Sequence, residues 1–329
     1  MLPSPPVVVL GDPGLLVDRL REQLLAQQVA HRVVHAEPGI QDVDALTTTF
    51  TGSQVVINAH GAFAATGHEV VEAALAAGCH YLDTSSDQNW LVKTRESWHR
   101  PYADRGLTLV PGLAQPFTTS EIAANISLET PGAEVLDILT LWNDLSADSS
   151  TQRLNRVAEN SGFDPRDPNA WPLDRTLNIR LPGRSEPGFA IRCDESPHQV
   201  WFGDDPRVTE MRAYGGATER SALERALARE LTCGPDECTS PLTHGRQVDT
   251  SVDSVYSEGS GRRTHVVLEG SCPYAETAAL LAVAARALLD APPHRTGFAS
   301  GCQAFGHRAL LDALVGAELV SPPLVTVNS

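Results

Sequence analysis

Residues 55–87 place the strongest constraint on the fold, because they read as a strand, a turn of small residues, a helix and a second strand. The run 55–57 is short and apolar, which is typical of a strand buried on both faces. Asn58, His60 and Gly61 follow it directly. Parallel strands joined by a helix form a right-handed unit, and ligands bind such sheets at the carboxyl ends of the strands. The segment therefore predicts half of a nucleotide-binding α/β layer.

The chain opens with the same arrangement: a strand at 7–10, a turn, a helix at 15–26 and a strand at 31–35. The turn is the expected place of a dinucleotide fingerprint, in which glycines let a pyrophosphate approach a helix N-terminus. Only part of that pattern is present, with Gly11 and Gly14 at two glycine positions and Val17 at the third. Asp12 adds a carboxylate and Pro13 removes a backbone donor, so both oppose phosphate binding.

The end of the second strand bears on the choice of cofactor. An acid there binds the ribose hydroxyls of NAD, whereas an Arg accommodates the phosphate of NADP. Glu37 favours NAD if it ends this strand, while Arg32 lies within the strand. The sequence leaves the choice between NAD and NADP open.

Residues 55–83 carry a recognisable set of positions: Asn58, Gly61, Phe63, Gly67, Gly78, His80, Tyr81 and Asp83. At these positions the segment resembles the pattern of the saccharopine dehydrogenase-like superfamily of NAD(P)-binding oxidoreductases. The positions that depart from it are Ala59, His60, Ala62 and Thr66. The strand at 106–111 and the turn after it, which includes Gly112 and Gln115, also resemble the superfamily. So does the end of the chain, from the strand at 263–268 through a long Ala/Leu helix.

The resemblance implies NAD or NADP as cofactor and hydride transfer to or from a C=N, C=C or C=O bond of a small metabolite. A strong preference for Arg over Lys suggests a GC-rich genome and a role in natural-product biosynthesis. The predicted cofactor-binding residues are Gly11, Asp12, Pro13, Gly14, Leu15, Glu37, Ala59, Gly61, Ala62, Gly112 and Gln115. The resemblance also implies a homodimer.

Three side chains at the strand ends are candidate catalytic residues. His60 carries an imidazole, the side chain best suited in general to proton transfer near neutral pH, although it also fits a turn cap or a block in the cofactor site. Asp83 ends a strand. Its carboxylate could form a hydrogen bond to a ribose or to the substrate, and it could equally well cap the following turn. Asp87 stands where the superfamily often has Glu, and it is a candidate for the substrate cleft. Tyr81 is expected in the core.

From about residue 133 the pattern changes to short strands, which suggests a second layer built on an antiparallel sheet. The predicted strands lie at 135–142, 176–181, 189–193, 199–202 and 207–214, followed by a helix at 221–231 and a final strand at 263–268. We predict an α/β fold: a Rossmann-type doubly wound parallel sheet with a second α+β domain on a mainly antiparallel sheet. The expected domains are 1–130 for dinucleotide binding, 131–270 for substrate and dimerisation, and 271–329 for C-terminal helices that pack back on the first.

Composition narrows the partners. A net charge of −16 argues against nucleic acid and anionic membranes. The first residues lack the pattern of a signal peptide, so the cytoplasm is expected. Six dispersed cysteines favour reduced thiols. Cys233, Cys238 and His244 do not have the spacing of a standard zinc site, so no metal is expected.

A rival interpretation belongs to another class of enzyme. The residues Asp12, Pro13 and Val17 suit a member of the superfamily that lost its cofactor and catalyses cyclisation, isomerisation or elimination with His60 and Asp83. A third interpretation is a ligand-binding protein without catalysis, since a fold alone does not define function.

Overall fold

The computed structural model describes residues 5–35, 42–61, 63–115, 117–132, 134–142, 176–181, 185–193, 195–227 and 251–328. The chain divides into two compact units. The first unit comprises residues 1–118 and 274–317, and the second comprises residues 119–273 and 318–329. Most of the second unit is therefore inserted into the sequence of the first.

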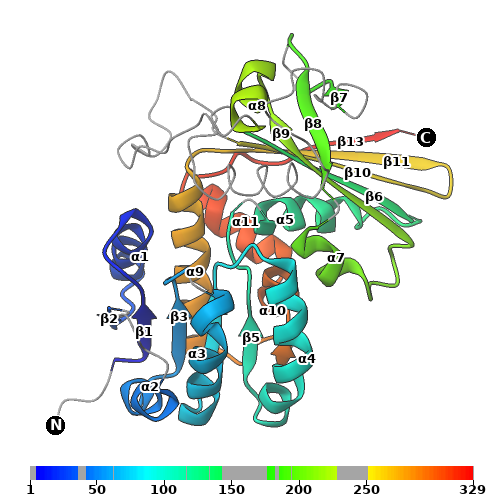
Figure 1. Ribbon diagram of the computed structural model, residues 1–329. Helices are drawn as coiled ribbons and strands as arrows, with labels where there is room; N and C mark the ends of the chain where they lie inside the picture. Colours follow the sequence, from blue (N-terminus) through cyan, green and yellow to red (C-terminus); the bar gives the residue numbers. More distant parts are fainter. Residues whose placement is uncertain are drawn as a thin grey trace. The chain divides into compact units, whose positions relative to one another are not determined.

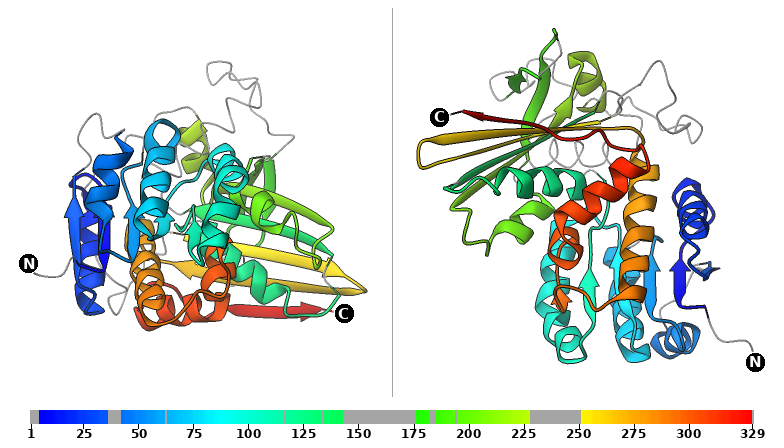
Figure 2. Two further views of the ribbon diagram at one scale, coloured as in Figure 1. Left: turned by 90° about the horizontal axis from the view of Figure 1, so that it is seen from below. Right: turned by 180° about the vertical axis from the view of Figure 1, so that it is seen from behind.

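The first unit is built on a six-stranded parallel sheet with the strand order β12-β5-β4-β3-β1-β2. Figures 1 and 2 show α3 and α4 on one face of this sheet and α9 and α10 on the other. The strands are β1 (Val7–Leu10), β2 (His31–Val34), β3 (Val55–Asn58), β4 (His80–Asp83), β5 (Thr108–Val110) and β12 (Gly297–Phe298). The helices are α1 (Leu15–Ala26), α2 (Val43–Phe50), α3 (Phe63–Ala77), α4 (Gln88–Asp104), α9 (Pro273–Asp290), α10 (Gly301–Phe305) and α11 (His307–Gly316).

The central strands of this sheet are buried on both faces, as their apolar runs predict. Val7, Val8 and Val9 of β1 are 0% exposed. Tyr81 in β4 is also 0% exposed, so its predicted place in the core is confirmed. The strand at 7–10 and the helix at 15–26 have the predicted bounds.

The second unit is built on a seven-stranded sheet in the order β13-β11-β10-β6-β9-β8-β7. Its neighbours pair antiparallel except β6 and β9, so the predicted fold class is confirmed. The strands are β6 (Val135–Trp142), β7 (Thr176–Ile179), β8 (Gly188–Cys193), β9 (Glu210–Ala217), β10 (Ser251–Gly259), β11 (Arg262–Gly270) and β13 (Leu324–Asn328). The helices are α5 (Phe117–Ser127), α7 (Pro197–Phe202) and α8 (Arg220–Leu227).

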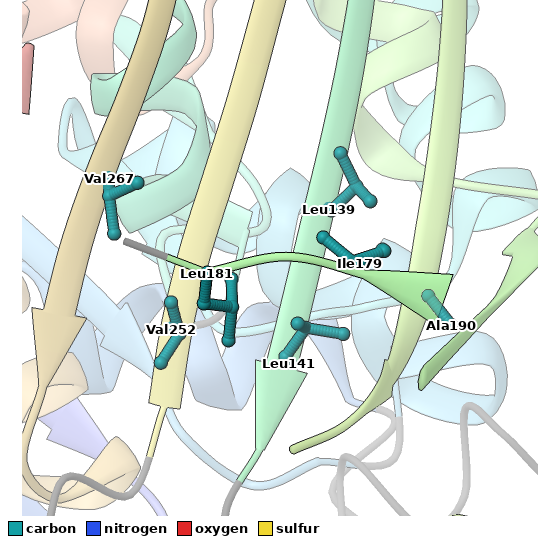
Figure 3. Close-up of a cluster of buried hydrophobic side chains, with 7 residues drawn as sticks. All are labelled: Leu139, Leu141, Ile179, Leu181, Ala190, Val252 and Val267. Atoms are coloured by element: carbon teal, nitrogen blue, oxygen red, sulfur yellow. The ribbon is translucent and has the colours of Figure 1, made fainter. Parts of the chain in front are cut away.

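A buried apolar cluster covers one face of this second sheet. Figure 3 shows Ile179 and Leu181 on a segment that crosses above the strands, with side chains close to those that the strands present. Tyr214 and Tyr256 pack against the cluster. Its members are Leu139, Leu141, Ile179, Leu181, Ala190, Val252 and Val267.

Two predictions for this unit are wrong. The apolar run at 199–202 belongs to α7 rather than to a strand, because Pro197 starts a helix that buries Val200 and Trp201. A short apolar run does not distinguish a buried helix from a strand. The strand at 263–268 is not the last one, since β12 and β13 follow it.

Strand β10 was absent from the prediction because its buried positions include polar side chains. Asp253 is 2% exposed, and its carboxylate accepts a hydrogen bond from Thr140 Oγ1 of β6 at 2.9 Å. A buried polar group is tolerated when it is paired across the sheet in this way. The hydrophobic pattern of the sequence does not record such pairs.

The cysteines depart in part from the prediction of reduced thiols. Cys79, Cys193 and Cys302 are buried and form no disulfide. Cys272 is disulfide-bonded, so the prediction is wrong at that position. None of the helices in the described ranges has the length and hydropathy needed to cross a membrane.

Candidate active site

The candidate site lies at the carboxyl ends of β1 and β3 in the first unit. From β1 the chain passes to β2 on one side and then to β3 on the other. Such a reversal is a topological switch point, where the turns leave the sheet in opposite directions and open a crevice for ligands. The residues after the two strands, 11–14 and 59–61, therefore border the place where a dinucleotide would bind.

The first of these turns contains Gly11 at a position of close packing. A Cβ on Gly11 would lie 3.0 Å from Val17 Cγ2 and 3.3 Å from Ala59 Cβ. Val17 thus fills the space beneath the turn, which explains how the chain accommodates a valine at the third fingerprint position. Gly11 supports the close approach of β1, α1 and the turn after β3.

The start of α1 has the properties of an anion site. Gly14 precedes the helix, and no described side chain caps its first N–H groups. A Cβ on Gly14 would meet only Asp12 O, at 4.0 Å, so the space above it is open as far as the described residues go. Uncapped N–H groups at a helix N-terminus favour phosphate. The residues fit a dinucleotide here, with the exposed carboxylate of Asp12 as the opposing feature.

Asp12 is in contact with His60 of the turn after β3. His60 Nδ1 lies 3.0 Å from Asp12 Oδ2, and the side chains are 25% and 54% exposed, respectively. The His60 backbone N–H donates to Asn58 Oδ1 at 3.2 Å. The pair therefore links the turn after β1 to the turn after β3, and both turns carry predicted site residues.

Asp83, at the end of β4, is fully buried and accepts four hydrogen bonds. Its Oδ1 accepts from the backbone N–H groups of Ser85 and Gly112, both at 2.9 Å. Its Oδ2 accepts from Trp90 Nε1 at 2.9 Å and from the Tyr81 hydroxyl at 3.1 Å. Burial raises the pKa of Asp83 to about 6, while these hydrogen bonds act in the opposite direction. The carboxylate holds the ends of β4 and β5 together.

The turn after β5 is positioned by this carboxylate and by α9. Gly112 has φ +82°, a conformation that favours glycine. The Gln115 backbone N–H donates to Thr277 Oγ1 at 3.1 Å. The Gln115 side chain is 3% exposed, and no group among the described residues bonds to either atom of its carboxamide. A buried carboxamide of this kind commonly faces a ligand or a water molecule.

Asp87 begins α4. Its carboxylate accepts hydrogen bonds from the backbone N–H groups of Asn89 at 2.9 Å and Trp90 at 3.3 Å. This is an N-cap, which stabilises the helix. Through Trp90 the cap also helps to place the indole that bonds to Asp83.

Comparison with known proteins assigns a family to the larger part of the chain. The model of a family of unknown function, DUF5938, matches residues 118–234 and 235–329. The chain belongs to this family. The saccharopine dehydrogenase NADP binding domain matches residues 15–110, which confirms the superfamily predicted for the first unit. No curated protein matches the chain.

Solved structures resemble this member of the family along almost its whole length. Saccharopine dehydrogenase (L-Glu forming) from Saccharomyces cerevisiae has 11% identity and a TM-score of 0.57, covering 98% of this chain and 100% of that one. DAP dehydrogenase from C. glutamicum, in complex with DAP, has 15% identity and a TM-score of 0.47, with coverages of 96% and 99%. The first likeness establishes the fold alone. Together with the matched domain, the fold supports an NAD(P)-binding oxidoreductase.

The structure brings some predicted residues together and leaves others apart. Asp12 and His60 form a pair, and Asp83 bonds to Gly112. Pro13 and Gly14 are exposed, while Leu15 and Ala59 are partly buried. Glu37, Ala62 and the potential zinc ligands Cys233, Cys238 and His244 lie outside the described residues. Within the described part, no three His, Cys, Asp or Glu side chains are arranged to hold a metal.

Arg32 does not serve as a ready phosphate ligand at the end of β2. Its Nη2 donates to the backbone carbonyl of Thr49 in α2. The guanidinium therefore ties β2 to α2, and the choice between NAD and NADP is not decided by this residue.

Two sets of contacts in this family member are not predicted from its sequence. Trp90 bonds to Asp83, and its ring lies so close to α3 that a Cβ on Gly67 would be 2.5 Å from Trp90 Cη2. In the second unit, His198 bonds through Nε2 to Ser120 Oγ at 2.9 Å and through Nδ1 to Ser196 Oγ at 2.7 Å. All three are at most 1% exposed, so this cluster is closed to a substrate. The contacts of Trp90 with Asp83 and of His198 with Ser120 have no local sequence signal, because the partners come from different elements.

Proposed function

We propose that this protein is an NAD(P)-dependent oxidoreductase that transfers hydride to or from a C=N, C=C or C=O bond of a small metabolite in natural-product biosynthesis. The observation that carries the proposal is the match of residues 15–110 to an NADP binding domain. The switch point between β1 and β3 supports it, as does a start of α1 that no side chain of the described residues caps. The bound cofactor would supply the hydride, and the protein would orient it and provide a proton.

Different turns of the first unit would bind different parts of the cofactor. The N–H groups at the start of α1 suit the pyrophosphate, with Gly14 leaving space for it. Gly61 has φ +81° and is exposed, so the turn after β3 presents backbone rather than a side chain at that point. By resemblance, the turn of Gly112 and Gln115 serves the nicotinamide end. His60, in the turn after β3, contacts Asp12 of the turn that leads into α1 and would supply the proton.

Titration with NADPH and NADH tests the proposal directly, with calorimetry and nicotinamide fluorescence followed together. We expect micromolar binding of at least one of them. The variant Gly14→Asp adds a carboxylate in open space at the start of α1, and we expect it to weaken binding by about tenfold. Gly316→Asp, at another exposed glycine with open surroundings, is the matched control. Absence of binding at millimolar concentration would reject the dehydrogenase function.

A second candidate is a non-redox acid/base reaction: cyclisation, isomerisation or elimination. The observation that favours it is the carboxylate of Asp12 beside the phosphate position, with His60 as its partner. A base oriented by a carboxylate is a common arrangement for proton abstraction. This candidate predicts exchange of carbon-bound protons of the substrate with D2O in protein freed of nucleotides, measured by NMR. Exchange that requires added NAD(P) would reject it.

We also propose that the protein is a cytoplasmic homodimer. Strand β13 lies at the edge of the second sheet and exposes Leu324, Val325 and Val327 at 51%, 45% and 53%. Exposed apolar residues on an edge strand favour association with another chain. Light scattering coupled to gel filtration measures the mass, and a single peak at monomer mass would exclude the dimer.

A further inference from the structure

Asp12, whose charge opposes phosphate binding, and His60, which departs from the superfamily pattern, are separated by 48 positions in the sequence and meet in the structure. We infer that they form a compensating pair that sets the affinity for the dinucleotide, with His60 acting as a positioning residue that offsets the charge of Asp12. This inference rests on the proposed function. It differs from the prediction that His60 is the proton donor and from the alternative that it blocks the site.

The charge of Asp12 opposes the binding of a phosphate nearby. The side chain is 54% exposed and belongs to the turn that leads into α1. An ionised carboxylate next to two phosphate charges weakens binding by an energy that depends on solvent screening, about 1 kcal/mol for each pair of charges at 4 Å in water. An isolated Asp12 would therefore lower dinucleotide affinity by about tenfold or more.

Two hydrogen bonds hold His60, one through its ring and one through its backbone. A carboxylate only accepts hydrogen bonds, so Nδ1 is the donor in the 3.0 Å contact with Asp12 Oδ2. That contact directs the imidazole at the carboxylate. The bond from the His60 N–H to Asn58 Oδ1 holds the backbone of the same residue. The ring is thus held against the carboxylate of Asp12, where it can offset the charge that an incoming phosphate would meet.

The effects of Asp12 and His60 on dinucleotide affinity should be coupled. If His60 serves Asp12, its removal matters only while the carboxylate is present. The effect of His60→Ala should then disappear in the background of Asp12→Asn. Residues in contact that act as a unit show such non-additivity in a double-mutant cycle.

The experiment measures the dissociation constants of NADPH and NADH for the full-length wild type, Asp12→Asn, His60→Ala and the double variant. We expect His60→Ala to weaken binding by about tenfold, and the double variant to bind as Asp12→Asn does. Because surface charges are screened by salt, the effect of His60→Ala should shrink at high ionic strength. Asp18→Asn, an acid in the first turn of the same helix, is the matched control and should change affinity less than about threefold.

Other results overturn the inference. Unchanged affinity with lost turnover in both backgrounds would assign His60 as a proton donor, and tighter binding by His60→Ala would assign it as a block. If His60→Ala does not fold, His60→Leu replaces it: this variant keeps a bulky side chain without a donor, and it should show the same coupling to Asp12. Binding that appears only after Asp12→Asn would reject the proposed function for the natural protein while supporting the role of the carboxylate. Absence of binding by all four proteins would reject both.

Discussion

The buried carboxylate of Asp83 leads to a prediction about stability and pH. The change Asp83→Asn removes the charge and keeps one oxygen, which can still accept from the N–H groups of Ser85 and Gly112. The new amide group takes the place of Oδ2 and faces Trp90 Nε1, which also donates. The indole is left without an acceptor, at a cost of about 1–3 kcal/mol.

The loss of charge acts in the opposite direction. The folded-state pKa of Asp83 is raised from 3.8 to about 6, chiefly by burial. A carboxyl whose pKa is higher in the folded state binds protons more tightly there, so the wild type loses stability as pH rises from 3.8 through about 6. A shift of roughly two units corresponds to about 3 kcal/mol at most. Above that range, removal of the charge nearly offsets the lost bond to Trp90.

Urea unfolding of the wild type and Asp83→Asn at about pH 4.5 and about pH 7.5 measures this balance. We expect similar stabilities at the higher pH, and a variant less stable than the wild type at the lower pH. The difference between the two proteins should change by about 2 kcal/mol across this interval. Asp42→Asn, at the exposed N-cap of α2, controls for the same chemical change. A difference that does not depend on pH would refute the assignment of a raised pKa to Asp83.

Three further predictions concern packing, titration and assembly. Gly67→Ala places a Cβ 2.5 Å from the Trp90 ring and should destabilise the protein by about 1–3 kcal/mol in chemical denaturation, whereas Gly316→Ala at an open site should not. Burial lowers the pKa of His265 to about 4, so NMR should show a neutral ring at pH values where an exposed histidine is already protonated; a midpoint near 6.5 would contradict this. Val327→Asp on the edge strand should convert the proposed dimer to a monomer with an unchanged circular dichroism spectrum; a retained dimer would place the interface elsewhere.

The sequence predicts the parallel sheet well because its strands are short apolar runs and its turns contain glycine. Residues 7–10 and 15–26 illustrate this, since hydrophobic spacing and the turn between them give the observed bounds. The second sheet is less accessible to such reasoning. Its strand β10 places Asp253, Ser254 and Ser257 in the interior, so burial there depends on partners in other strands.

In the candidate site, too, the sequence predicts some features and not others. The positions of the turns follow from the strands, and Gly11 and Gly112 have the close packing or positive φ that requires glycine. The partners of the polar residues do not follow from local sequence. The contact of Asp12 with His60 and that of Asp83 with Trp90 depend on the distance between elements, which only tertiary packing determines.

The edge strand β12 has a consequence for the order of synthesis. It completes the first sheet beside β5. Gly297 N–H of β12 donates to Leu107 O, just before β5, at 2.7 Å, and Ala299 N–H, just after β12, donates to Leu109 O of β5 at 3.0 Å. His99 Nδ1 of α4 accepts from the Phe298 N–H at 3.1 Å. During translation, about 180 further residues must therefore be synthesised after residues 1–118 before β12 can pair with β5. Until then the edge of β5 is exposed. A fragment that ends after β5 should aggregate, while a fusion of residues 1–118 to 274–317 through a short linker is the smallest segment expected to fold as the dinucleotide-binding unit.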